Sequence, residues 1–402
     1  MEILRFTTAG SVDDGKSTLI GRLLHDTGNI KSDVLEAIST VQGLNLAHIT
    51  DGLRTERKDG ITIDIGYKYF SSATRKYIIA DAPGHFQYTR NLVTGASNVD
   101  VMIVLLDAMN GITNQTCVHT LVASFLGTPN IVVAVNKMDK TGYDENVFKA
   151  LKDEYLQLID NLNIKRIDFI PISALCGDNI ITVSENMSWY KGKTLMEYLD
   201  GCVPNSNSSV SALRLNIQYV YDYLDTTGFV GNILGGNMNT GDSAVLYPQN
   251  KRVVIQKIIK GYTEVNEASV NDNVSVLLDE KVVMNRGDMI VDLQTLTETC
   301  SFTAKICWLD SNNQLLLGKN YLLRFNAKEV SCVIIEIVSK VNPVTYQEFN
   351  GETYVNANEF ATVRIVTESE IIYDRVTESL QMNRGIIIDL DTYYTSGVFI
   401  IV

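Results

Sequence analysis

The stretch that decides the fold lies at residues 10–17 and reads GSVDDGKS. It matches the pattern GxxxxGK followed by Ser or Thr. An apolar run, LRFTTAG, leads into it and a helix-like segment, KSTLIGRLL, leads out of it, which is the strand-to-helix context that the motif requires. Glycines at such a turn let the backbone wrap around phosphate groups, and the backbone N–H groups and the helix N-terminus attract the anion. A chance match in a glycine-rich turn is the alternative, and the flanking strand and helix argue against it.

This loop is predicted to supply much of the nucleotide site. Lys16 offers a positive charge to the β and γ phosphates, and the hydroxyl of Ser17 can hold Mg²⁺. The residues expected to contact the nucleotide here are Gly10, Ser11, Val12, Asp13, Asp14, Gly15, Lys16, Ser17 and Thr18.

Around the loop, the N-terminal half of the chain alternates short apolar runs with amphipathic, helix-like stretches. After the run that leads into the loop come KYIIADA, VDVMIVLLDA, NIVVAVNKMD and IDFIPIS. These runs are continuously apolar, which is typical of strands buried on both faces of a sheet. Residues 1–206 are therefore predicted to form an α/β P-loop domain with a doubly wound, mostly parallel sheet. Each chemical motif below follows one of these strands, where open α/β sheets bind ligands.

The pattern changes after residue 204. The stretch PNSNSS at 204–209 is small and polar, as a linker is. Beyond it the helical pattern gives way to short β-type runs in two series, one from about residue 211 and one from about residue 299. Two antiparallel β-barrel domains are predicted, over residues 210–297 and 298–402.

A second motif, NKMD, follows the apolar run NIVVAV. A buried carboxylate at Asp139 can accept hydrogen bonds from the ring N–H and the amino group of guanine, whereas adenine would leave it unpaired. Asn136 can brace the loop, and the stem of Lys137 can lie over the purine. A solvated turn is the alternative for this short pattern alone. The triplet SAL after the next strand adds support, and the predicted guanine site comprises Asn136, Lys137, Met138, Asp139, Ser173, Ala174 and Leu175.

The hydrolytic centre is expected in the loop DAPGH, where the run KYIIA ends. Asp81 can reach Mg²⁺ through a coordinated water, and Gly84 lets the backbone approach the γ-phosphate. Thr62 could complete the Mg²⁺ shell with Ser17, so its loop is expected to be ordered by GTP and released on hydrolysis. The residues of this loop predicted to contact the nucleotide are Asp81, Ala82, Pro83, Gly84 and His85.

His85 is the best candidate for orienting the attacking water, because it follows the glycine that approaches the γ-phosphate. The alternative is that His85 is a structural turn residue. The other histidines, His25, His48 and His119, have no partner acid nearby in the sequence and are expected to be structural.

Composition narrows the class of protein further. The 402 residues include 34 basic and 47 acidic side chains, a formal charge of −13 that gives no general attraction to nucleic acid or anionic lipid. Six cysteines without a CxxC pair, and only four histidines, favour reduced thiols over disulfides or structural zinc. The N-terminus lacks a signal-peptide pattern, and the aliphatic run VMIVLL at 101–106 is too short to span a bilayer. A soluble, cytoplasmic protein is expected.

Taken in order, GSVDDGKS, GITI, DAPGH, NKMD and SAL resemble a translation-factor-type GTPase related to elongation factor Tu, followed by its two barrels. Longer stretches, among them DGLRTERKDGITIDIGYKYF and SENMSWYKGKTLMEYL, are similar to the large, GTPase subunit of heterodimeric ATP sulfurylase (sulfate adenylyltransferase subunit 1). The resemblance is dense over residues 5–205 and thinner through both barrels.

This resemblance implies a GTP-hydrolysing subunit that uses Mg²⁺ and binds a smaller catalytic subunit as a heterodimer. GTP hydrolysis would be coupled to formation of adenosine 5′-phosphosulfate and pyrophosphate from ATP and sulfate. It also implies that Val12 and Ile61 form an apolar gate beside the catalytic histidine. The family commonly has DTPGHEQYTRN where this chain has Ala82 and Phe86, a difference that bears on how His85 is oriented.

Two other functions remain open from the sequence. The three-domain plan permits an elongation-factor-like GTPase that delivers RNA or acts at the ribosome, although the acidic charge argues against it. A nucleotide-dependent switch that regulates another enzyme is the third possibility, and Phe86 is the feature that favours it.

Overall fold

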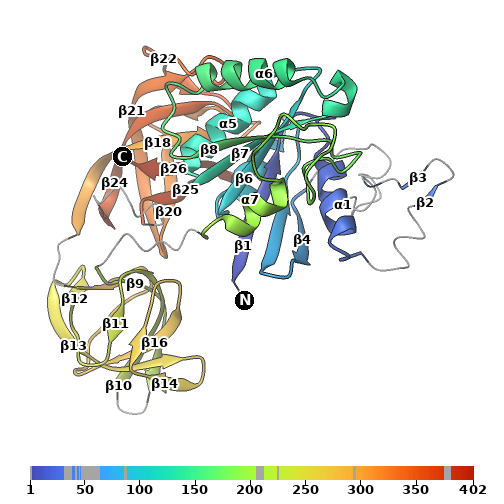
Figure 1. The fold of residues 1–402 in the computed structure, drawn as a ribbon. Coiled ribbons are helices and arrows are strands. Elements are labelled where there is room, and N and C mark those ends of the chain that lie inside the picture. The colour runs from blue at the N-terminus through green and yellow to red at the C-terminus, as the bar shows by residue number, and fades with distance from the viewer. Residues whose placement is uncertain are drawn as a thin grey trace. The chain divides into compact units, whose positions relative to one another are not determined.

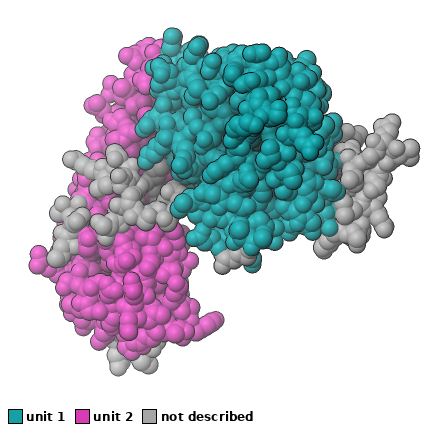
Figure 2. Space-filling model, in the orientation of Figure 1, with its two compact units in different colours: residues 1–204, 342–347 teal, residues 205–341, 348–402 magenta. Residues whose placement is uncertain are grey.

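The computed structural model describes residues 2–30, 39–40, 43–44, 46, 64–85, 88–204, 212–223, 226–292, 296–374 and 382–402. Its internal contacts divide the chain into two compact units (Figure 2). Unit 1 comprises residues 1–204 together with 342–347, and unit 2 comprises residues 205–341 together with 348–402. Within the described ranges, no helix combines the length and the apolar character needed to cross a membrane.

Unit 1 is built on a six-stranded sheet with the order β4-β5-β1-β6-β7-β8 (Figure 1). β4 runs antiparallel to β5, and the other neighbours pair in parallel. Every residue of β6 and β7 is buried, as expected of central strands covered on both faces. The predicted mostly parallel sheet is confirmed. Its strands are β1 (Ile3–Ala9), β4 (Gly66–Ser71), β5 (Lys76–Asp81), β6 (Val101–Asp107), β7 (Asn130–Asn136) and β8 (Ile167–Pro171).

Among the described helices of unit 1, three begin where a side chain accepts from one of the first backbone N–H groups. Thr113 and Thr116 form a reciprocal capping box at the start of α5, and Thr194 and Glu197 do so at α7. The helices are α1 (Lys16–Asp26), α4 (Thr89–Ala96), α5 (Asn114–Leu126), α6 (Glu145–Leu158), α7 (Leu195–Gly201) and the 3₁₀ helix η3 (Met138–Thr141). A short hairpin is formed by β2 (Ser39–Thr40) and β3 (Gly43–Leu44).

The core of unit 1 fixes the two elements on either side of the phosphate loop. Phe6 of β1 and Leu19, Ile20 and Leu23 of α1 are all fully buried in one apolar cluster. A helix packed in this way cannot slide along the sheet without opening cavities. The loop between β1 and α1 is therefore held at both ends.

The first barrel of unit 2 has the strand order β12-β17-β9-β10-β16-β13-β14, and pairing of β12 with β13 closes it. All its pairs are antiparallel. Its strands are β9 (Arg214–Tyr223), β10 (Thr226–Gly235), β12 (Ser243–Tyr247), β13 (Lys251–Lys260), β14 (Thr263–Val265), β16 (Asn273–Leu278) and β17 (Met289–Val291). The strands β11 (Met238–Asn239) and β15 (Glu267–Ala268) pair beside it.

The second barrel has the order β20-β25-β26-β18-β24-β21-β22 and is closed by pairing of β20 with β21. It is also antiparallel throughout. Its strands are β18 (Thr297–Trp308), β20 (Asn320–Phe325), β21 (Lys328–Val341), β22 (Glu348–Phe349), β24 (Phe360–Tyr373), β25 (Arg384–Asp389) and β26 (Thr395–Ile401). β19 (Leu315–Leu316) pairs with β23 (Tyr354–Val355). Each barrel has its own apolar core, and the predicted fold class is confirmed.

Residues 342–347 connect β21 to β22 but belong to unit 1 by their contacts. The hydroxyl of Tyr346 donates a hydrogen bond to the carbonyl of Cys117 in α5, at 2.8 Å and buried. The predicted domain limits place this segment with the second barrel, because a contact 229 residues apart leaves no trace in the local sequence.

Candidate functional site

The phosphate loop leads from β1 into α1. Gly15 is the residue before the helix and has a φ of +97°. A Cβ on this residue would collide with the side-chain amide of Asn136. Glycine is therefore required here both by the backbone conformation and by the close approach of β7.

Lys16 turns its ammonium group back into the loop. Its Nζ donates to the carbonyl of Ser11 at 2.7 Å and to that of Gly10 at 3.1 Å. Burial lowers the pKa of Lys16, while the nearby carboxylates of Asp14, Asp81 and Asp13 oppose this effect. The cation thus lies among carbonyls that phosphate oxygens can replace.

Gly84 brings the loop DAPGH against the same cation. A Cβ at Gly84 would lie 2.9 Å from the carbonyl oxygen of Gly10 and would collide with Nζ of Lys16. The structure therefore brings the segment predicted to approach the γ-phosphate next to the phosphate loop. No side chain larger than hydrogen fits between them.

Asp14 is an acid in a setting that disfavours its charge. Its side chain is 2% exposed and accepts a hydrogen bond from the N–H of Ser11. Burial raises the pKa of Asp14 to about 6, although the Ser11 hydrogen bond and the charge of Lys16 lower it in part. The folded protein therefore keeps a proton on Asp14 to a higher pH than it would on an exposed aspartate.

Asn136, at the end of β7, joins two loops. Its Nδ2 donates to the backbone carbonyl of Asp14 at 2.7 Å, and its Oδ1 accepts from the N–H of Ala174 at 2.9 Å. The side chain is buried, so both bonds are shielded from water. One amide therefore sets the distance between the phosphate loop and the triplet SAL.

The other residues of the predicted base site are held in place by protein contacts. Ser173 Oγ donates to Asp139 Oδ1 at 2.6 Å and accepts from the N–H of Cys176 at 3.1 Å. Lys137 has a left-handed φ of +63°, and its Nζ pairs with Asp107 Oδ2 at 2.7 Å. The carboxylate of Asp139 is thereby oriented by a neighbour on the SAL loop before any base arrives.

His85 lies at the end of the loop DAPGH. Its Nδ1 is buried and accepts or donates no hydrogen bond within the described part of the chain. Its ring makes an edge contact with Tyr88, at 6.1 Å between ring centroids. The ring is restrained by its neighbour, and its Nδ1 can still form a hydrogen bond. Such an imidazole is suited to bind a water or a substrate atom.

Known proteins match this chain over its whole length. Residues 1–205 match the family model of the elongation factor Tu GTP binding domain, and residues 301–402 match that of the GTP-eEF1A C-terminal domain-like family. Sulfate adenylyltransferase subunit 1 of Cellvibrio japonicus (strain Ueda107) is 40% identical over 411 residues, which cover 100% of this chain and 87% of that protein. The chain belongs to the sulfate adenylyltransferase subunit 1 family.

The subunit 1 of Teredinibacter turnerae (strain ATCC 39867 / T7901) is 40% identical too, over 98% of this chain and 86% of its own length. Among solved structures, that of sup35 complexed with GDP covers 100% of this chain and 94% of its own, at 20% identity and a TM-score of 0.46. The family resemblance found from the sequence motifs is confirmed by the two full-length relatives.

Some residues singled out from the family pattern lie outside the described residues. These are Ile61, Thr62 and Phe86. Val12, the other residue of the implied apolar gate, is 37% exposed. Ala82 is fully buried, so the position where the family commonly has threonine faces the interior of the domain.

Sequence reasoning missed two residues that contact the phosphate loop in this subunit 1 homologue. Gln115 and His119 both lie on α5, where His119 was expected to be structural only. Gln115 Oε1 accepts from Ser11 Oγ at 3.2 Å, and His119 Nδ1 accepts from the N–H of Gly10 at 2.9 Å. The available signal was weak, because Gln115 and His119 are two of several polar residues on this helix, and only their spacing of four residues places them on one face.

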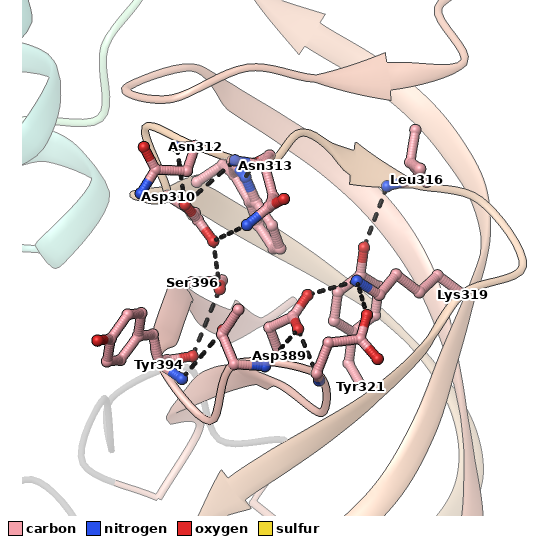
Figure 3. Close-up of polar contacts among 12 residues, drawn as sticks. Asp310, Asn312, Asn313, Leu316, Lys319, Tyr321, Asp389, Tyr394 and Ser396 are labelled. Carbon is pink, nitrogen blue, oxygen red and sulfur yellow. Dashed lines mark hydrogen bonds and ion pairs between the residues drawn. The ribbon is translucent and has the colours of Figure 1, made fainter.

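A separate polar cavity of about 540 Å³ lies in the second barrel. Figure 3 shows the polar contacts of several residues that line it. Asp310 accepts hydrogen bonds from the N–H groups of Asn312 and Asn313 and from Ser396 Oγ. On another wall, Lys319 pairs with Asp389 at 2.6 Å. Protein groups thus bond both of these charges.

Proposed function

We propose that this chain is the GTPase subunit of sulfate adenylyltransferase, working in the cytoplasm. It hydrolyses GTP to GDP and phosphate. A partner catalytic subunit uses this reaction to drive formation of adenosine 5′-phosphosulfate and pyrophosphate from ATP and sulfate. The observation that carries the proposal is the 40% identity to proteins named sulfate adenylyltransferase subunit 1 across essentially the full chain.

Binding of the phosphates is supported by the geometry around Lys16. Its ammonium exchanges the carbonyls of Gly10 and Ser11 for β and γ phosphate oxygens without leaving its place. Backbone N–H groups of the loop and the N-terminus of α1 add further attraction for the anion.

Selection of guanine is supported by the prepared carboxylate of Asp139. Ser173 donates to one of its oxygens, which fixes the side chain while the carboxylate retains acceptor capacity for the two donors on the guanine edge. Asp139 is half-buried in the free protein. Adenine has no matching pair of donors, and a carboxylate that the bound base covers and leaves unpaired costs on the order of 1–3 kcal/mol.

The predicted Mg²⁺ ligands fit that ion in their chemistry. Ser17 offers a hydroxyl in the first turn of α1, and Asp81 offers a buried carboxylate close enough to Lys16 to affect its pKa. Hard oxygen donors of this kind suit Mg²⁺, which when bound would neutralise charge on the β and γ phosphates. Thr62, the third predicted ligand, lies outside the described residues.

Hydrolysis is assigned to His85. The ring contact with Tyr88 restrains the imidazole at the end of the loop that Gly84 brings against Lys16, and its Nδ1 has no protein hydrogen-bond partner within the described residues. An imidazole at this point orients the attacking water in line with the γ-phosphate. Catalysis then consists mainly of positioning and charge stabilisation, as in other phosphoryl transfers.

The test compares the purified chain alone with the chain mixed with an ATP sulfurylase catalytic subunit. Alone, it is expected to release phosphate slowly from GTP and to make no adenosine 5′-phosphosulfate. With the partner and GTP, pyrophosphate release from ATP and sulfate should rise, and replacing GTP by a non-hydrolysable analogue should remove that rise. Rapid phosphosulfate synthesis by the single chain would contradict the proposal, and GTP-dependent retention of charged tRNA on a filter would favour RNA delivery instead.

A further inference from the structure

Two side chains of α5 accept hydrogen bonds from the phosphate loop. His119 lies in the middle of α5, 1% exposed, and its Nδ1 accepts a hydrogen bond from the backbone N–H of Gly10 at 2.9 Å. One helical turn earlier, Gln115 Oε1 accepts from Ser11 Oγ at 3.2 Å. Residues four apart lie on the same face of a helix, so this face of α5 bonds two successive residues of the loop.

Gly10 is the residue on which the loop turns. Its φ of +143° is open to glycine and strained for other residues, and a Cβ would lie 2.8 Å from the carbonyl of Leu105. Its own carbonyl accepts from Nζ of Lys16 at 3.1 Å. Gly10 is therefore bonded at both backbone groups: its N–H donates to His119, and its carbonyl accepts from Lys16.

We infer that His119 is a positioning residue for the phosphate loop: through Nδ1 it fixes Gly10, and so sets the place of the loop and of Lys16 for binding guanine nucleotides. The inference rests on the nucleotide binding proposed above. His119 touches no predicted substrate atom and acts through Gly10.

The tautomer follows from the geometry. A backbone N–H can donate only to an unprotonated nitrogen, so the imidazole is neutral with its proton on Nε2. Burial, with a smaller contribution from the charge of Lys16, lowers the pKa of His119 to about 3. The acceptor therefore persists throughout the pH range in which the protein would work.

Two substitutions separate positioning from packing. In His119→Asn, Oδ1 stands where Nδ1 stood, one bond beyond Cγ, so an acceptor for the N–H of Gly10 is kept while most of the ring is lost. In His119→Leu, more of the volume is kept and the acceptor is lost. Packing alone predicts that the Asn variant is the less stable of the two, because it leaves the larger cavity.

The experiment titrates a fluorescent GDP and a fluorescent GTP analogue into the full-length wild type and both variants, and measures urea unfolding without nucleotide. We expect His119→Leu to bind both nucleotides at least about tenfold more weakly, the effect of one unmade buried hydrogen bond. His119→Asn should remain within about threefold of wild type, although it unfolds at the same or a lower urea concentration.

Each outcome decides the question. Equal affinity of His119→Leu and wild type, or an equal loss in both variants, would overturn the positioning role. If the Leu variant does not fold, tight binding by the Asn variant supports the inference and a tenfold loss refutes it. A wild type that binds no guanine nucleotide would instead refute the proposed function on which the inference rests.

Discussion

Asn136→Ala tests whether one buried amide sets the geometry between the phosphate loop and the base loop. The substitution removes the bond to the carbonyl of Asp14 at 2.7 Å and the bond from the N–H of Ala174 at 2.9 Å. Each buried partner left unpaired costs on the order of 1–3 kcal/mol. With two such partners, we expect the variant to lose about 2–6 kcal/mol of unfolding free energy.

The same strand offers a matched control. Asn130, at the start of β7, is also buried, and its Nδ2 donates to the carbonyl of Asp100 at 2.9 Å. Asn130→Ala leaves a single buried partner unpaired and should cost about 1–3 kcal/mol of unfolding free energy. It removes no bond to the phosphate loop, so its affinity for nucleotide should stay close to that of wild type.

The assay has two parts. Urea unfolding of the nucleotide-free protein gives the stability of each variant, and titration with fluorescent GTP and GDP analogues gives affinity. Asn136→Ala should weaken both nucleotides by about tenfold or more, because both use the phosphate loop and the base loop together. If Asn136→Ala binds as tightly as wild type, or if Asn130→Ala loses as much affinity, then Asn136 does not hold the two loops in register.

Three further predictions concern single residues. His85→Ala should leave GTP affinity nearly unchanged while lowering single-turnover hydrolysis by about a hundredfold or more; a collapse of affinity would show a structural role. Asp139→Asn should shift preference toward xanthosine nucleotides in a competition assay, and an unchanged preference for GTP would refute the assigned base contact. Burial raises the pKa of Asp14 to about 6 from an ordinary 3.8, so between these values the folded protein keeps a proton that the unfolded chain has lost. The contribution of Asp14 to the free energy of unfolding is therefore full below pH 3.8 and is lost as pH rises through 6. Between pH 5 and pH 7.5, the free energy of unfolding measured in urea should fall by about 1.5 kcal/mol more in wild type than in Asp14→Asn. Parallel pH profiles for the two proteins would contradict this.

The sheet of unit 1 was predictable because its central strands are buried on both faces and appear in the sequence as continuous apolar runs. β4 escaped this reasoning. It lies at the edge of the sheet, and within GYKYFS the side chains of Tyr67 and Tyr69 are exposed while Phe70 is buried. β26, with the sequence TSGVFII, was not among the predicted apolar runs either. An edge strand and a strand that begins with small polar residues carry weaker local signals than a buried one.

The candidate site likewise contains residues that local sequence predicts and residues that it does not. The motifs that contain Lys16, His85 and Asp139 have fixed spacings, so their identity was available from the sequence. The residues that hold these groups in place could not be predicted from the sequence. Ser173 reaches Asp139 over 34 residues, and His119 reaches Gly10 over 109. Such pairs depend on which strands become neighbours, and the local sequence does not contain that information.

This division explains why the supports are the more informative targets for mutation. A change at Lys16 or Asp139 removes a group that touches the nucleotide, so a loss of binding reports only that the group is needed. His119 is expected to touch no nucleotide atom, and Asn136 belongs to the predicted guanine site as the residue that braces its loop. Each bonds the backbone of the phosphate loop from a separate element, α5 and β7. Affinity for nucleotide is expected to fall in Asn136→Ala and His119→Leu. It should survive in His119→Asn, which keeps an acceptor, and in Asn130→Ala, which removes only a remote bond. That result would show that the loop is not rigid by itself. Its shape would then be imposed by the sheet and helix around it, as expected for a glycine-rich turn with little conformational preference of its own.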